Sequence, residues 1–575
     1  MEKDKMKILM ATAFPTQGAG SGALVTTQAK SYQEAGHEVT IITGNNRSNF
    51  DKLDGVKYHL VPFTSEAEQP EKLEGQLPFN YLMFTTHTES TANFWKVGLE
   101  DLEQYVTADR NALSEEAKNC DVIHAQHNWL LSSSATDMDK PVVTTIHGTD
   151  LMGYERSKKE LSTTLNKLNT LKANSKDGSF GLSTSDIAKV EEVYMRASSV
   201  KDIRRGVKDL IESKAIVGSK ADIMQLVDVL DDKRKYEFYI RESEKSAKKS
   251  DKIIVISDAQ KEKFNSLFPF AADKVELLEN GYDPKTFYVD KTIKREDVIP
   301  MLTSDRTPDG KIDMDYDSLI LFVGKFADFK GIDSLLAGAK LYEDKLMSEG
   351  KKPLTLIVGS GALEAKLKAE VEQLGLQNTH FVGRQPHNVI CKLQNLADVS
   401  LIPSRDEPFG LVVIEGTACG HPVIGSNSGG IPGILNTKKE KLPNQNIIKT
   451  DLGVLIKPLP ERPVSLSQEE KEALDVLSSD YVIANSTERE ELAKKAVAEF
   501  GLEDEVTSYL KDYAQSTEAL AESVEKIVNG ELFFDNDHIA EYTKSNYSQS
   551  IIRDKLIDVY RRAGEHKKKD KSLEH

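Results

Sequence analysis

The chain has 575 residues, of which 39% are hydrophobic and 29% charged, and its formal net charge is −17. This composition is typical of a globular protein and excludes a largely disordered chain. The acidic balance argues against nucleic acid as a partner, because phosphate binding needs a basic surface. The three cysteines lack metal-ligand spacing and no apolar run is long enough to span a membrane. We therefore expect a cytoplasmic protein of two or more domains, without strong membrane association.

The first half of the chain alternates apolar strands with helical segments. Residues 7–13 predict a buried strand, followed by a glycine-rich loop, a helix over 23–36 and a strand over 37–43. This order is that of a parallel βαβ unit. Further buried strands are predicted at 120–127, 141–148 and 251–257.

The same alternation restarts near residue 318, after a connection over 288–317. The sequence therefore predicts an α/β fold of two Rossmann-like doubly wound domains, whose ligands lie at the carboxyl ends of strands. Strands are predicted at 318–326, 354–361, 379–384, 397–404 and 421–426, and helices at 330–346 and 362–375.

Two long polar segments, 155–240 and 460–525, interrupt this pattern. Residues 189–214 predict one amphipathic helix, and Ser467, followed by two glutamates, predicts a helix start. We interpret both segments as helical insertions on the surface, with oligomerisation through them as the alternative. The predicted domains are 1–300, 301–540 and a C-terminal helix over 541–575 that packs back on the first domain.

Two loops contain candidate phosphate-binding groups. After the first strand, Gly20 and Gly22 would let backbone amides approach a phosphate or sugar. The spacing of this loop does not match the dinucleotide fingerprint, which disfavours a nicotinamide enzyme and leaves a tight turn as the alternative. After the strand that begins at Ser318, Lys325 and Lys330 form a pair of ammonium groups suited to a diphosphate. The alternative for these lysines is a solvated loop.

Glu407 and Glu415 flank the start of a predicted short helix that ends at Gly420. Because carboxylates repel phosphate, we expect both to bind hydroxyl groups on either side of one. The first amides of such a helix can receive phosphate oxygens, and here they are those of Phe409, Gly410 and Leu411.

Taken together, these motifs resemble the retaining family-four glycosyltransferases (glycosyl transferases group 1), which have the GT-B fold. The resemblance covers roughly residues 6–150 and 245–455. It implies an N-terminal acceptor-binding and a C-terminal nucleotide-sugar-binding domain that face a central cleft. The residues that carry it lie at 280–283, 323–331, 358–367, 403–424 and 428–435.

The resemblance also implies a role for each candidate residue. Glu415 would bind the ribose hydroxyls of the donor, and Glu407 would contact the transferred sugar near the reaction centre. Lys325 and Lys330 would hold the diphosphate, although the family usually has arginine at the first position, and lysine lacks its bidentate fork. His147 matches a histidine near the donor sugar, and together with Glu407 and Lys330 forms the catalytic set. Further donor contacts would be Gly20, Gly22, Gly361 and Arg384, and acceptor contacts Ser21 and His124, with a purely structural role as the alternative for His124.

The activity implied by the resemblance is that of a retaining hexosyltransferase. It would move a sugar from a UDP-, GDP- or ADP-sugar to a carbohydrate or other hydroxyl acceptor, with no metal and no further cofactor. Lysines and helix amides would meet the charge of the leaving diphosphate. A GT-B epimerase that acts on nucleotide sugars and a non-catalytic nucleotide-sugar-binding protein are the alternatives.

Overall fold

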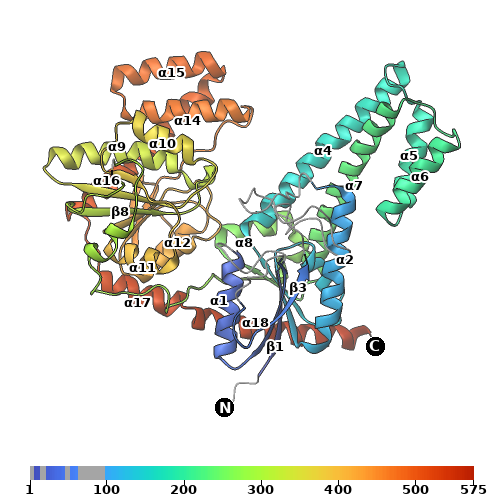
Figure 1. The fold of residues 1–575 in the computed structure, drawn as a ribbon, viewed down its shortest axis with the longest axis horizontal. Helices are drawn as coiled ribbons and strands as arrows, with labels where there is room; N and C mark the ends of the chain where they lie inside the picture. Colours follow the sequence, from blue (N-terminus) through green and yellow to red (C-terminus); the bar gives the residue numbers. More distant parts are fainter. Residues whose placement is uncertain (1–4, 13–20, 46–51, 63–96, 308, 575) are drawn as a thin grey trace. The chain divides into compact units, whose positions relative to one another are not determined.

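The computed structural model of the chain describes residues 5–12, 21–45, 52–62, 97–307 and 309–574, which fold as two compact units (Figure 1). Unit 1 contains the described residues up to Ile256, then Lys261–Leu278 and the stretch from Arg553 onward. Unit 2 contains Ser257–Gln260 and Glu279–Ile552. The chain thus changes units at Leu278, earlier than the predicted boundary at residue 300, and returns to unit 1 within its last helix.

Unit 1 is built on a parallel sheet with the strand order β3-β2-β1-β4-β5-β6-β7 among the described residues. The central strands are buried along most of their length, as expected for a parallel sheet covered on both faces. The buried strands predicted in this half are confirmed. The strands are β1 Lys7–Ala11, β2 Glu38–Asn45, β3 Lys57–Pro62, β4 Val122–Gln126, β5 Val142–Ile146, β6 Lys252–Val255 and β7 Val275–Leu277.

The segment between β5 and β6 forms a helical arm. Figure 1 shows α4 (Gly148–Asp177) and α7 (Lys220–Lys249) side by side, with α5 and α6 at their far end. The arm has an apolar cluster of its own that includes Ile187, Ile203 and Leu226. Its helices α5 and α6 are Thr184–Arg196 and Val200–Glu212. The other helices of unit 1 are α1 Ser21–Glu34, α2 Leu99–Glu116, α3 Leu131–Ala135, α8 Asp258–Leu267 and α18 Gln549–Glu574. Both α8 and α18 start in unit 2.

The single helix predicted over 189–214 is wrong. The structure breaks it after Arg196, and Ser199 caps the next helix by accepting a hydrogen bond from the backbone amide of Asp202 (3.1 Å). The carboxylate of Asp202 in turn accepts the amide of Ser199. This reciprocal cap satisfies two amides that a continuous helix would have bonded internally.

Unit 2 repeats the doubly wound pattern, with the strand order β10-β9-β8-β11-β12-β14-β13. Only β13 is antiparallel to its neighbour among the described strands. The strands are β8 Ser318–Val323, β9 Pro353–Val358, β10 Thr379–Phe381, β11 Val399–Ile402, β12 Val423–Ser426, β13 Ile447–Lys449 and β14 Gly453–Ile456. The helices are α9 Ile332–Ser348, α10 Glu364–Gln373, α11 His387–Leu396, α12 Leu411–Ala418, α13 Ile431–Leu435, α14 Gln468–Ile483, α15 Ser486–Phe500, α16 Glu503–Val528 and α17 Asn536–Tyr547.

The second helical insertion, α14 to α16, packs on α9 of unit 2. Its apolar cluster includes Leu474, Val506 and Tyr513 and extends to Ala337 on α9. Ser467 caps α14 through a reciprocal bond with Glu470, so the predicted helix start is confirmed.

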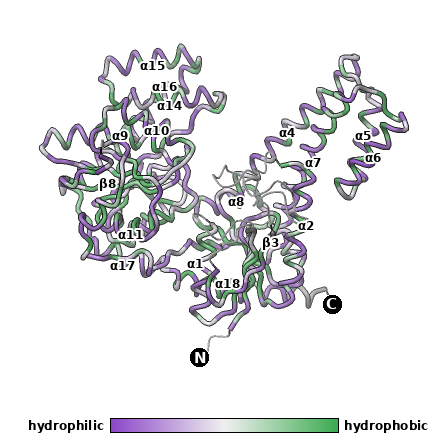
Figure 2. Tube along the Cα trace, in the orientation of Figure 1, coloured by the Kyte–Doolittle hydropathy of each residue, from purple (hydrophilic) through white to green (hydrophobic). Residues whose placement is uncertain are grey.

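Figure 2 shows that the most hydrophobic segments gather on the sheet strands, for example around β8. Within the described part of the chain, every helix is either too short or too polar to cross a membrane. The predicted α/β fold with two Rossmann-like doubly wound domains is confirmed.

Candidate functional site

In unit 2 the strand order reverses between β8 and β11, which pair through Ile320 with Val399 and Leu321 with Ser400. In doubly wound sheets, ligands bind at such a reversal, beyond the carboxyl ends of the strands. The loops that leave β8 and β11 are those that contain the predicted lysines and glutamates. Topology therefore brings together two loops about eighty residues apart in sequence.

The two loops touch through their backbones. The amide of Arg405 donates to the carbonyl oxygen of Phe329 (2.8 Å). Gly331 adopts φ +65°, and a Cβ at this position would lie 2.1 Å from the carbonyl oxygen of Pro403. Only glycine fits such a close approach in this left-handed conformation.

Lys330 and Glu407 form an ion pair at this edge of the sheet. Their side chains are 16% and 12% exposed. The resemblance put Lys330 on the phosphate and Glu407 on the sugar, and the structure joins the two side chains directly. A bound phosphate would therefore have to compete with Glu407 for the Lys330 ammonium.

Glu415 lies on α12 and is partly buried. Burial raises the pKa of its carboxyl group to about 7, against the opposing attraction of Lys330. The helix begins after Gly410, and Gly420 (φ +90°) follows its end, which confirms the predicted helix and its terminal glycine. The first amides of a helix have no acceptor within it. Of the three predicted amides, only that of Leu411 belongs to α12, while Gly410 (φ +105°) is its N-cap and Phe409 precedes the cap.

The loops after β8, β9 and β10 also meet. The amide of Phe326 donates to the carbonyl oxygen of Ser360 (2.9 Å), and a Cβ at Gly361 would lie 2.3 Å from the carbonyl oxygen of Phe326. The Arg384 Nε donates to the Ser360 hydroxyl (2.6 Å). Burial and the nearby Arg384 lower the pKa of Lys325. Lys325, Gly361 and Arg384 thus gather at one edge of unit 2.

In unit 1 the corresponding reversal lies between β1 and β4. Gly20 is outside the described residues. Ser21 begins α1 and Gly22 follows in its first turn, which puts both at the start of the helix that follows β1.

His147 precedes α4 and is buried. Its backbone amide donates to the Asp150 carboxylate (2.7 Å), and its Nε2 lies 2.8 Å from the Gln126 side-chain oxygen. Burial, followed by the nearby His127 and His124, holds its pKa well below the usual value. His147 is therefore a neutral imidazole.

His124 is fully buried on β4. Its Nδ1 lies 2.6 Å from the Tyr560 hydroxyl and its Nε2 2.7 Å from the Thr145 hydroxyl. Burial lowers its pKa to about 3. Because both nitrogens have partners, the structural alternative fits the geometry of His124, and its acceptor contact stays a prediction.

Sequence reasoning missed Gln126, Arg405 and Tyr560. Gln126 lies two residues after His124 on the same strand, so both side chains share one face, and its amide nitrogen lies 3.3 Å from His124 Nε2. Arg405 belongs to the loop of Glu407, but its long-range partners leave no local pattern. Tyr560 bonds both His124 and the Tyr32 hydroxyl (2.6 Å).

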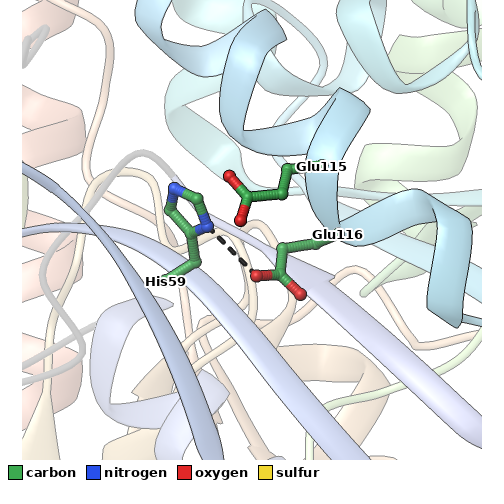
Figure 3. Close-up of side chains that lie close together, drawn as sticks. All are labelled: His59, Glu115 and Glu116. Carbon is green, nitrogen blue, oxygen red and sulfur yellow. Dashed lines mark hydrogen bonds and ion pairs between the residues drawn. The ribbon is translucent and has the colours of Figure 1, made fainter.

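Away from these loops, the described residues bring together one group of possible metal ligands, His59 on β3 with Glu115 and Glu116 at the end of α2 (Figure 3). The Lys57 ammonium lies 2.9 and 2.7 Å from the two carboxylate oxygens of Glu116. His59 Nδ1 lies 3.1 Å from one of them. Ion pairing therefore accounts for the buried Glu116 carboxylate.

Comparison with known proteins assigns a family to the part of the chain that contains these loops. Residues 310–451 match the family model described as glycosyl transferases group 1. This region is a glycosyl transferases group 1 domain. It contains Lys325, Lys330, Glu407 and Glu415, and the predicted family is confirmed for this part of the chain.

Curated relatives of the chain include an uncharacterized glycosyltransferase of Methanocaldococcus jannaschii, 33% identical over 191 residues, which are 33% of this chain and 46% of the relative. A D-inositol 3-phosphate glycosyltransferase of Jonesia denitrificans is 27% identical over 205 residues, 35% of this chain and 46% of the relative. The chain therefore spans about half the length of these curated relatives.

The fold of the whole chain is similar to a solved glycosyltransferase structure from Rickettsia africae ESF-5. The TM-score is 0.50 at 15% sequence identity, covering 98% of this chain and 99% of the other. Two Rossmann-like units in one chain, one of them a glycosyl transferases group 1 domain, form the GT-B architecture. The predicted fold class is thereby confirmed.

Proposed function

We propose that this protein is a retaining glycosyltransferase that moves a sugar from a nucleotide sugar to a hydroxyl acceptor without a metal ion. The observation that carries the proposal is the Lys330–Glu407 ion pair at the reversal of strand order, next to Glu415 and the start of α12. This combination lies within the glycosyl transferases group 1 domain. The named activities of the relatives support the reaction class.

Unit 2 would bind the donor through charge. A diphosphate brings two negative charges to the loops of Lys325 and Lys330, and the amides at 409–411 add hydrogen-bond donors at a helix start. Once the donor is bound, these groups would stabilise the charge that develops on the leaving group. A metal ion would be redundant where two lysines and a helix end supply this positive potential.

Glu407 and Glu415 would then have different roles. When phosphate takes the Lys330 ammonium, the Glu407 carboxylate becomes available to the sugar, where it can accept hydroxyl hydrogen bonds and stabilise positive charge on the ring. Glu415 would accept hydrogen bonds from the ribose hydroxyls. A neutral His147 would bond a sugar hydroxyl without adding charge.

In the transfer itself, the bond between the anomeric carbon and the diphosphate oxygen breaks. The acceptor oxygen forms its bond to the same face of the sugar, which retains the configuration. The proton of the acceptor hydroxyl passes to the released phosphate oxygen. The products are a glycoside and a nucleoside diphosphate.

Binding of UDP-, GDP- and ADP-sugars is the first test, measured as a rise in the unfolding temperature. A donor at about 100 times its dissociation constant adds roughly 2.7 kcal/mol to the free energy of unfolding. Product analysis with the stabilising donor then separates the alternatives, because an epimerase changes the sugar without transferring it and a binding protein does neither.

Lys330→Ala and Glu415→Ala should each lower donor affinity or turnover at least about tenfold, since each removes a direct contact of the donor. Unchanged kinetics in both variants, or no stabilisation by any donor, would overturn the proposal.

A further inference from the structure

A buried charge cluster lies beneath the two loops of the proposed donor site. It consists of Arg405, Arg462, Asp333 and Asp475, whose side chains are between 6% and 13% exposed. Arg405 belongs to the loop of Glu407, and Asp333 lies in the first turn of α9, just after the loop of Lys330. The other two members come from the second helical insertion and the segment that leads into it.

Arg462 joins the insertion to the lysine loop. Its Nε and Nη2 each donate to one carboxylate oxygen of Asp475 on α14, both at 2.8 Å. Its Nη1 and Nη2 also donate to the two oxygens of Asp328, at 2.8 and 2.7 Å. Asp328 opens the short 3-10 turn Asp328–Lys330, which ends at Lys330 itself. The Arg462 guanidinium therefore forms bidentate hydrogen bonds with two carboxylates, those of Asp475 and Asp328.

Arg405 joins the insertion to the glutamate loop. Its Nη2 donates to Asp333 (2.6 Å), which also accepts the hydroxyl of Tyr513 from α16 (3.0 Å). The guanidinium lies 5.8 Å from the centre of the Tyr513 ring. The Tyr509 hydroxyl, also from α16, lies 3.3 Å from Asp475. Arg405 Nη2 also lies 3.8 Å from Asp475, so both loops contact the same cluster.

The cluster is expected to add little to the free energy of unfolding. Desolvation of buried ion pairs offsets most of their attraction, and well-packed apolar residues of similar volume are often as stable or more so. Burial alone would raise the pKa of Asp333, but Arg405 and Arg462 outweigh it and hold that pKa below the usual value. Asp333 therefore stays ionised between the two arginines, and its directional bonds favour a role in fixing geometry.

We propose that Arg462 is a positioning residue for donor binding, because it holds the loop of Lys330 in place through Asp328. The second helical insertion then supports the loops of Lys330 and Glu407, and we call this support the brace. This inference rests on the proposed function. It gives the insertion a role inside its own unit, in place of the oligomerisation that the sequence left as an alternative.

The test compares nucleoside diphosphates with nucleoside monophosphates. Isothermal titration would measure UDP, GDP and ADP against UMP, GMP and AMP, above the second phosphate pKa of about 6. The variants are Asp328→Asn and Arg462→Met. In this proposal Lys330 contacts the phosphate that only the diphosphate has, so each variant should lower diphosphate affinity about tenfold and leave monophosphate affinity within about twofold.

Asp328→Asn keeps the buried Arg462–Asp475 pair, and Asp328 is 56% exposed, so this variant should fold even if Arg462→Met does not. Glu518→Gln is the matched control. Glu518 is a partly exposed carboxylate of the same insertion whose arginine partner, Arg489 at 2.7 Å, does not reach either loop. The control should keep the wild-type ratio of diphosphate to monophosphate affinity.

The outcomes are distinct. If the wild type binds a diphosphate and Asp328→Asn keeps its affinity ratio, the brace is overturned while the proposed function stands. An equal loss for diphosphate and monophosphate also overturns it, because that result indicates general loosening of the fold. If the wild type binds none of the six nucleotides, the proposed function fails and the inference fails with it.

Discussion

At the scale of single residues, burial and Lys330 act in opposite directions on the titration of Glu415. Burial favours the protonated form of Glu415, while Lys330 favours the ionised form. Near neutral pH the carboxyl is therefore close to the midpoint of its titration. A donor that needs the carboxylate to accept ribose hydrogen bonds must remove that proton when it binds.

Donor affinity should consequently rise with pH up to about 7 and level off above it, because the carboxylate form is the one that binds. The slope cannot exceed about tenfold per pH unit. A nucleotide sugar is the right probe, since its diphosphate lacks the terminal phosphate group that titrates near pH 6. Isothermal titration across this range checks the prediction.

Glu415→Gln should remove this pH dependence. Glu415 should also make the stability of the protein without donor depend on pH, and this dependence has the opposite sign to that of donor affinity. The folded carboxyl keeps its proton up to about pH 7 and the unfolded one only up to about 4.5, so the native protein loses stability as pH rises between these values. The glutamine variant should lack that decline, and an unchanged pH slope in both measurements would refute the assignment to Glu415.

At the scale of elements, the site depends on how closely two loops approach. The amide of Arg405 reaches the carbonyl oxygen of Phe329, and Gly331 leaves no room for a side chain against Pro403. The short helix α12 follows directly from the same loop. The position of Lys330 is therefore determined by backbone packing as well as by its ion pair.

Gly331→Ala should destabilise the protein by about 2–4 kcal/mol and weaken donor binding, because it adds a steric clash to the strain of a left-handed backbone. Gly375→Ala is the matched control. Gly375 has almost the same φ, +63°, but a Cβ there meets no heavy atom within 4 Å, so only the strain of about 1 kcal/mol should appear. Equal losses in the two variants, measured by chemical denaturation, would show that the contact with Pro403 is unimportant.

At the scale of the whole molecule, local sequence patterns predicted the features that depend on local chemistry. The strands, Ser467 as a helix cap and the glycine that ends α12 follow from periodicity and turn residues. The helix break near Ser199 was missed because apolar residues recur every three or four positions on both sides of it, as they would in one continuous helix. Arg405, Arg462 and Tyr560 were missed because their partners lie far away in sequence, and no pattern in one chain marks such pairs.

Unit 1 is completed by the far end of the chain. From Arg553 onward, α18 belongs to unit 1, and its buried residues include Leu556, Ile557 and Tyr560. Tyr560 joins Tyr32 to His124, which bonds the Gln126 side chain that reaches His147. A proposed sugar-binding histidine is thus linked to the last helix.

A chain that ends at Ile552 should therefore lose stability in unit 1 and keep it in unit 2. Each buried leucine or isoleucine removed costs about 2 kcal/mol, and His124 loses the partner of its Nδ1. Hydrogen exchange should accelerate in β1 and β4 while β8 and β11 stay protected. Arg562→Gln is the control, because it removes an exposed ion pair with Glu276, a pair of the kind worth at most about 1 kcal/mol. Equal acceleration in both units of the truncated chain would show that α18 stabilises the molecule as a whole and not unit 1 in particular.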